Sequence, residues 1–136
     1  MNLANVAVTE GRFKDALSIL RPLLNARSSA NAYLLLQGNL AAAQAGIGLK
    51  DYARAEHDLE QELTTAQRAG MRFDSARIYY LLGTSARLSG QGVRAAGDYR
   101  EAAQLLDAIR SDPGAENILR RADVKTMYDE SNRWKQ

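Results

Sequence analysis

Three short stretches decide the fold of this chain: EGRFKDA at 10–16, LKDYARA at 49–55 and SGQGVRA at 89–95. They align without gaps, and each ends in an alanine, so the unit recurs about every 40 residues. Four residues beyond each alanine stands a large apolar side chain, namely Leu20, Leu59 and Tyr99. A small residue lets two antiparallel helices approach, and a bulky residue one turn later fills the space beside them. The repeat therefore predicts a series of helix pairs.

The rest of the chain also favours helices alone. Apolar residues recur with a period near 3.6, and no stretch of four to eight residues alternates as a strand would. Glycines fall where each apolar stretch stops, at positions 11, 46, 48, 70, 90 and 92. Glycine supplies the left-handed conformation that ends a helix. Pro22 lies inside one stretch and predicts a kink or a break there. The predicted fold class is all-α, with about six helices and a short N-terminal one.

The last predicted helix spans Pro113 to Trp134 and lies outside the repeat. Asp112 followed by Pro113 is typical of a helix start, because aspartate caps the helix and proline is tolerated at its first position. One face of this helix is charged and the other apolar, as in a helix that closes the open end of a repeat array. The predicted inner face consists of Ile118, Leu119, Ala122, Met127 and Trp134. We therefore predict repeats over 1–110 and a C-terminal capping helix over 111–136.

Two successive helices carry a recognisable pattern of small and large residues, at Tyr79, Leu82, Gly83, Ala86, Gly90, Ala95, Tyr99 and Ala102. This pattern resembles helices A and B of the tetratricopeptide repeat (TPR) family, and Leu34, Gly38 and Ala41 match helix A one repeat earlier. The unit is longer than the usual ~34 residues, and Lys50 and Gly92 depart from the pattern. The resemblance implies antiparallel helix pairs stacked as a right-handed superhelix. It implies about two and a half repeats, the first of them truncated.

The same resemblance implies where a partner binds. In tetratricopeptide arrays the A helices line the concave surface, and residues one turn around from the packing positions meet the ligand. In this chain those residues are Leu35, Asn39, Ala42, Arg77, Tyr80, Thr84 and Arg87. Arginine forks onto carboxylates, and arginine and tyrosine are frequent interface anchors, so we expect a protein or peptide partner of acidic character. The alternative is that these side chains pack against the terminal helix.

The residue inventory favours a non-catalytic protein. The chain has no cysteine and one histidine, His57, which excludes thiolate metal sites, cysteine nucleophiles and multi-histidine metal centres. Glu56 and Glu60 lie one helical turn apart without a further oxygen cluster. The glycine-containing stretch 46–50 lacks the strand and the spacing of a phosphate-binding loop. We therefore expect no enzymatic activity, no cofactor and no metal.

The setting of the chain is predicted from what it lacks and from a second resemblance. No stretch approaches the ~20 apolar residues of a membrane span, and the N-terminus does not resemble a signal peptide, so we expect a cytoplasmic protein without membrane contact. Residues 112–130 resemble the C-terminal end of repeat regions in bacterial multidomain signalling proteins, including serine/threonine kinases. That resemblance implies that the chain is part of a larger protein, with a scaffold role.

Two other functional classes stay open at this stage. A structural module that forms a homodimer through its truncated first helix would show a mass that depends on concentration. A nucleic-acid-binding helical repeat would show a steep salt dependence. The net charge of +2 and the acidic residues interspersed among the arginines argue against the second of these.

Overall fold

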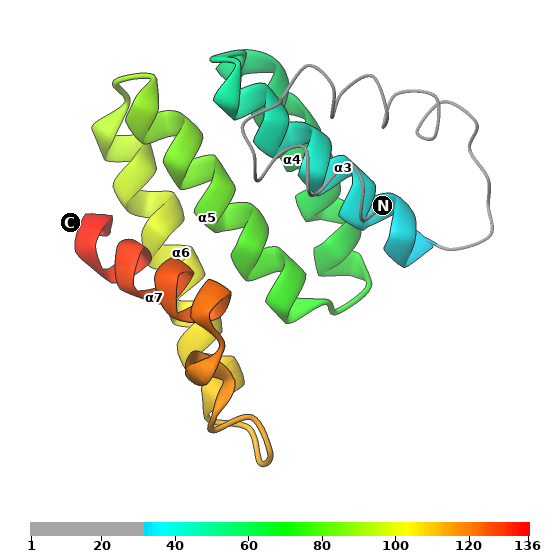
Figure 1. The fold of residues 1–136 in the computed structure, drawn as a ribbon, viewed down its shortest axis with the longest axis vertical. Coiled ribbons are helices and arrows are strands. Elements are labelled where there is room, and N and C mark those ends of the chain that lie inside the picture. Colours follow the sequence, from blue (N-terminus) through cyan, green and yellow to red (C-terminus); the bar gives the residue numbers. More distant parts are fainter. Residues whose placement is uncertain (1–31) are drawn as a thin grey trace. The chain divides into compact units, whose positions relative to one another are not determined.

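The computed structural model describes residues 32–136, and every regular element in this range is helical (Figure 1). The elements are α3 (Ala32–Gly48), α4 (Tyr52–Arg68), α5 (Arg72–Leu88), α6 (Gly92–Arg110), η1 (Ile118–Arg120) and α7 (Ala122–Trp134). The prediction of an all-α fold is confirmed for this part of the chain. None of these helices has the length and apolarity needed to cross a membrane. The predictions for the first repeat and for Pro22 lie outside the described residues.

Contacts divide the chain into two compact units, Met1–Glu62 and Leu63–Gln136. The boundary falls within α4. The second unit therefore contains the end of α4 together with α5, α6, η1 and α7. Residues 111–136, which the sequence separates from the repeats, belong to the same unit as α5 and α6.

The turns after α3, α4 and α5 share one backbone geometry. In each turn a single residue has a left-handed conformation: Lys50 (φ 66°), Gly70 (φ 69°) or Gly90 (φ 84°). The next residue donates its backbone N–H to a carbonyl five residues earlier, over 2.8–2.9 Å. This pattern satisfies carbonyls that the end of a helix leaves unpaired. The same turn recurs every twenty residues, and Lys50 stands where the other two turns have glycine.

In the first unit, α3 and α4 form an antiparallel pair. A Cβ placed on Gly46 would lie 3.6 Å from the Cβ of Ala55, so the two backbones approach closely near the turn. Leu36, Leu40 and Leu59 are fully buried. Leu34, matched above to the helix A pattern, is 51% exposed. That match was out of register, because the shared turn aligns α3 with α5 forty residues later.

In the second unit, α5 and α6 pack closely and α7 lies against both (Figure 1). A Cβ on Gly83 would lie only 3.0 Å from ring atoms of Tyr99, so this glycine makes room for the ring. Ala76 and Leu106 form a buried cluster with Val124 and Met127 of α7. This cluster is the core through which the C-terminal segment joins the repeat.

The C-terminal helix begins at Ala122, so the predicted start at Pro113 was wrong. The carboxylate of Asp112 pairs with Arg72 at the beginning of α5 and caps no helix. The Asp112 backbone N–H donates to Ile109 at 3.0 Å and extends the end of α6. Gly114 then has a left-handed conformation (φ 86°), which a helix does not accommodate. Tertiary contacts and this glycine therefore override a good local start signal.

Candidate interaction surface

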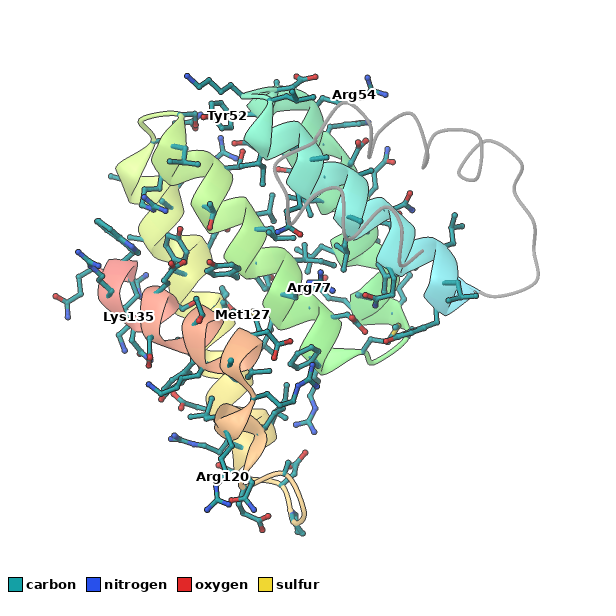
Figure 2. The ribbon with its side chains drawn as sticks, in the orientation of Figure 1. Tyr52, Arg54, Arg77, Arg120, Met127 and Lys135 are labelled. Carbon is teal, nitrogen blue, oxygen red and sulfur yellow. The ribbon has the colours of Figure 1, made fainter. Side chains whose placement is uncertain are left out.

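The candidate functional site is the surface of α5 and α6 that contacts α7. We call it the α7-binding surface and define it by Phe73, Ala76, Tyr80, Arg87, Leu106 and Asp107. Its apolar centre receives Val124 and Met127, the second of which is labelled in Figure 2. Its polar positions bind other side chains of α7. An apolar centre with polar anchors around it is the usual arrangement of a protein-binding surface.

Two side chains that lie seven residues apart on α5 anchor α7. The Tyr80 hydroxyl donates a hydrogen bond to the carboxylate of Glu130. Two helical turns further along α5, the guanidinium of Arg87 lies 4.8 Å from the ring centre of Trp134. Arg133 lies over the same ring at 5.1 Å, so two cations contact the indole. These contacts select a carboxylate and an aromatic ring one helical turn apart.

The two anchors are connected through Tyr99 of α6, which is fully buried. Arg87 Nε donates to the Tyr99 hydroxyl at 3.2 Å, and that hydroxyl lies 2.9 Å from Thr84 Oγ1. Thr84 uses its own proton to bind the Tyr80 carbonyl at 3.0 Å, so Tyr99 is the donor to Thr84. The ring centres of Tyr80 and Tyr99 lie 6.0 Å apart, and the two rings are tilted relative to each other. The Arg87 side chain is therefore held by the Tyr99 hydroxyl, and the Tyr80 side chain packs beside the Tyr99 ring.

The two anchors keep their protonation states over a wide pH range. Burial raises the pKa of Tyr80, and its hydrogen bond to Glu130 raises it further. The hydrogen bond to Tyr99 raises the pKa of Arg87. Tyr80 therefore remains a neutral donor and Arg87 a cation throughout the physiological pH range.

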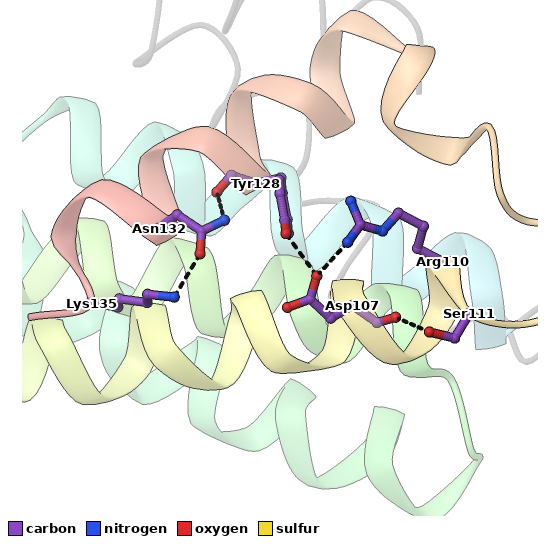
Figure 3. A network of polar contacts seen from close by, with 6 residues as sticks. All are labelled: Asp107, Arg110, Ser111, Tyr128, Asn132 and Lys135. Atoms are coloured by element: carbon purple, nitrogen blue, oxygen red, sulfur yellow. Dashed lines mark hydrogen bonds and ion pairs between the residues drawn. The ribbon is translucent and has the colours of Figure 1, made fainter.

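A second set of contacts holds α7 to α6, as Figure 3 shows. The Tyr128 hydroxyl donates to Asp107 at 2.7 Å, and Arg110 pairs with the same carboxylate at 3.2 Å. The Arg110 guanidinium also lies 5.3 Å from the Tyr128 ring centre. Further along, Arg100 donates to the carbonyl of Lys135 at 3.0 Å. Asp107 and Arg110 are half-exposed, so this set positions α7 more than it stabilises it.

The contacts also establish the direction of α7. Along α5, Phe73, Tyr80 and Arg87 meet positions 121, 130 and 134 in increasing order. Along α6, Asp107 and Arg100 meet positions 128 and 135 in the opposite order. Helix α7 therefore runs with α5 and against α6.

The structure brings together three of the site residues predicted from the sequence, Tyr80, Thr84 and Arg87. They lie on one face of α5, and two of them contact the terminal helix, as the alternative interpretation held. Arg77 is half-buried on the same helix (Figure 2). Leu35 and Asn39 belong to the other unit, where Leu35 is 38% exposed. Asn39 there donates to Glu62 at 2.6 Å, and Ala42 is half-buried.

Three participants were missed from the sequence. Tyr99 was predicted only as a packing residue, yet its hydroxyl connects Thr84 and Arg87. Glu130, one of the charged residues of the last helix, binds Tyr80, although the sequence gives no sign of this contact. Val124 was left out of the inner face of the last helix but is fully buried, whereas the predicted Ala122 is exposed. The spacing Val124-x-x-Met127 is the signal that could have placed the apolar face correctly.

No metal-binding group emerges from residues 32–136, where no three His, Cys, Asp or Glu side chains gather. His57 lies on an exposed helix face, and its ring contacts Gln61 at 3.1 Å. A pocket of about 340 Å³ lies beside α6 and is lined by Arg100, Ala103, Gln104, Asp107, Lys135 and Gln136. Three of these residues already take part in the contacts between α6 and the α7 segment.

Comparisons with protein-family models, with curated proteins and with solved structures give no match for this chain.

Proposed function

We propose that this chain is a non-catalytic protein-interaction scaffold of the tetratricopeptide type. Its α7-binding surface receives a peptide helix of a partner protein. One observation carries the proposal. The α5 side chains expected to meet a ligand, Tyr80 and Arg87, do hold a helix, and that helix is α7.

The course of α7 supports this function. It runs with α5 and against α6. The next helix A of a stacked repeat would take the same course. Buried residues occur on only one face of α7, at Val124, Met127 and Ser131, whereas α5 is buried on most of its circumference. A surface that accepts one added helix in this way is suited to helix-in-groove recognition.

The chemistry of the surface supports an acidic partner. Tyr80 donates to a carboxylate, and Arg87 presents a cation beside an aromatic ring. Arg77 lies between Phe73 and Tyr80 on the same helix. A helix with a carboxylate followed by an aromatic residue one turn later fits this arrangement.

The test is binding of a helix supplied in trans. A fluorescein-labelled peptide of residues 117–136 is titrated with the full chain carrying Met127→Ala, which weakens the hold of the chain's own α7 by opening a cavity in the buried cluster. We expect saturable binding by fluorescence anisotropy, with circular dichroism confirming that the chain stays helical.

The matched control compares two arginines in this chain. Arg87→Ala removes a contact with Trp134 and is expected to weaken binding about tenfold. Arg94 lies on α6 outside the α7-binding surface and donates to the neighbouring Gln91, so Arg94→Ala is expected to leave the affinity unchanged. Absence of binding by a folded chain, or equal losses for both variants, would contradict the proposed function.

A further inference from the structure

Helix α7 carries one side chain that does not suit its position. The hydroxyl of Ser131 is fully buried and has no hydrogen-bond partner among residues 32–136. Ser131 lies seven residues after Val124 and four after Met127, so it shares their buried face. A buried hydroxyl without a partner loses its bonds to water and gains none in return. An apolar side chain of similar size would fit this position better.

The other features of α7 also describe a ligand that is held moderately. Its fully buried apolar contacts come from two residues, Val124 and Met127. Its own ion pairs, Arg121 with Asp123 and Lys125 with Asp129, join residues of the same segment at exposed positions, so they do not hold α7 to α5 or α6. The segment that connects it to α6 contains only the three-residue η1, in which Ile118 and Leu119 are half-buried against the same cluster. These observations indicate that α7 fits the α7-binding surface imperfectly.

We propose that α7 is a replaceable ligand of the α7-binding surface and that the partner is a helix of defined pattern. The partner has apolar residues at the positions equivalent to Val124 and Met127. It has a carboxylate at the position equivalent to Glu130 and an aromatic ring at the position equivalent to Trp134. At the position of Ser131 it has alanine or another small apolar residue, and through this difference it displaces α7. This inference rests on the proposed function, because it names the partner of the same surface.

The expected advantage of such a partner is modest but measurable. Replacing a buried, unpartnered hydroxyl by a methyl group is expected to strengthen binding about fivefold. A tethered helix competes at an effective concentration of the order of millimolar. A partner equal to α7 in every contact would therefore reach half-displacement at a concentration of the order of millimolar, and the gain at the Ser131 position lowers this concentration about fivefold.

The experiment compares three peptides of residues 117–136 on the full Met127→Ala chain. The native peptide is the reference, and the Ser131→Ala peptide is expected to bind about fivefold more tightly. Alanine also favours the helix itself. The Thr126→Ala peptide controls for this, because Thr126 is exposed on the same helix. We expect the Ser131→Ala gain to exceed the Thr126→Ala gain clearly.

A second measurement follows displacement in the unaltered chain. Trp134 is the single tryptophan of the sequence, so its emission reports the state of α7. Competing peptides that carry Trp134→Phe contain no tryptophan, so they do not contribute to this emission. As they displace α7, Trp134 leaves Arg87 for water and its emission moves to longer wavelength. The Ser131→Ala version is expected to reach half-displacement at about one fifth of the concentration needed with serine.

The outcomes separate the inference from the proposed function. If no peptide binds the folded Met127→Ala chain, both fail. If the peptides bind but the Ser131→Ala and Thr126→Ala gains are equal, the surface accepts a helix and the inference about its partner is overturned. If light scattering of the unaltered chain shows a dimer that exchanges α7 between copies, the partner is a second copy, and the proposed pattern is overturned as well.

Discussion

The hairpins α3–α4 and α5–α6 follow one plan and fill it with different residues. Both turn through a left-handed residue, and both place a buried alanine five residues later, Ala55 or Ala95. Nine residues after the turn stands Leu59 in the first hairpin and Tyr99 in the second, each fully buried. Seven residues before the turn, the first hairpin has alanine and the second has Gly83.

This difference shows how the second hairpin comes to hold α7. The missing methyl group at Gly83 leaves room for the ring of Tyr99, which leucine does not need. The hydroxyl of Tyr99 then reaches Thr84 and Arg87, and Arg87 contacts Trp134 of α7. In the first hairpin Leu40, Gln44 and Ile47 stand at the positions of Tyr80, Thr84 and Arg87. The change of core residues between the two hairpins is therefore accompanied by a change of the side chains on this face.

The largest expected effect comes from giving the second hairpin the leucine of the first. Tyr99→Leu leaves Gly83 without its ring and is expected to lower the free energy of unfolding by about 2–3 kcal/mol, through a cavity and through lost hydrogen bonds. Urea denaturation followed by circular dichroism measures this. Tyr99→Phe keeps the ring and is expected to cost about 1 kcal/mol. Equal costs would show that ring volume contributes nothing.

The next prediction tests the pairing of small and large residues. Gly83→Ala brings a methyl group to 3.0 Å from a ring that cannot move, because the ring is buried and its hydroxyl is held. Overpacking of about 1–3 kcal/mol outweighs a helix-propensity gain of about 1 kcal/mol. We expect a net loss of about 1 kcal/mol in the unaltered chain. In a Tyr99→Leu background the same substitution should stabilise, and an unchanged sign would break the comparison.

Substitutions in the turns are expected to have two smaller effects of opposite sign on stability. Gly90→Ala places a side chain at φ 84° and is expected to cost about 1 kcal/mol, since left-handed backbone disfavours a Cβ. Lys50→Gly relieves the same conformation at φ 66° and is expected to stabilise by about 0.5–1 kcal/mol. Thermal denaturation of the two variants beside the unaltered chain measures both. A loss on Lys50→Gly would mean that the lysine side chain stabilises its turn.

The smallest expected effect concerns pH and the first hairpin. Burial raises the pKa of Glu62 above 4.5, the repulsion of Asp58 adds to this, and the hydrogen bond from Asn39 opposes it. The fold therefore favours the protonated form. The stability that this provides is full below pH 4.5 and is lost as the pH rises through the folded-state pKa.

Glu62→Gln keeps an acceptor for Asn39 and removes the ionisation. It is expected to be slightly more stable than the unaltered chain at pH 7 and equal to it at pH 4, as measured by denaturation at the two pH values. Asn39→Ala removes the opposing hydrogen bond and should deepen the loss toward neutral pH. A Glu62→Gln chain that is less stable at pH 7 would contradict this account.

Much of the local structure could be predicted from spacing. The 3.6-residue periodicity indicated the four helices between positions 32 and 110 and their pairing, and glycines marked two of the three turns. The face shared by Tyr80, Thr84 and Arg87 followed from their spacing of four and three residues. The start of the last helix could not be predicted in this way. Asp112 has two possible uses, and its pairing with Arg72, forty residues earlier, took precedence over capping.

For residues 32–136 the sequence by itself determined helices and two hairpins whose turns lie forty residues apart, because helical periodicity and turn chemistry depend on near neighbours. Only the tertiary structure decided that α7 occupies the face where a partner was expected. That outcome depends on contacts between residues about fifty positions apart, such as Tyr80 with Glu130. It also left the Ser131 hydroxyl buried without a partner, since a helix that packs by its apolar stripe buries every residue on that stripe.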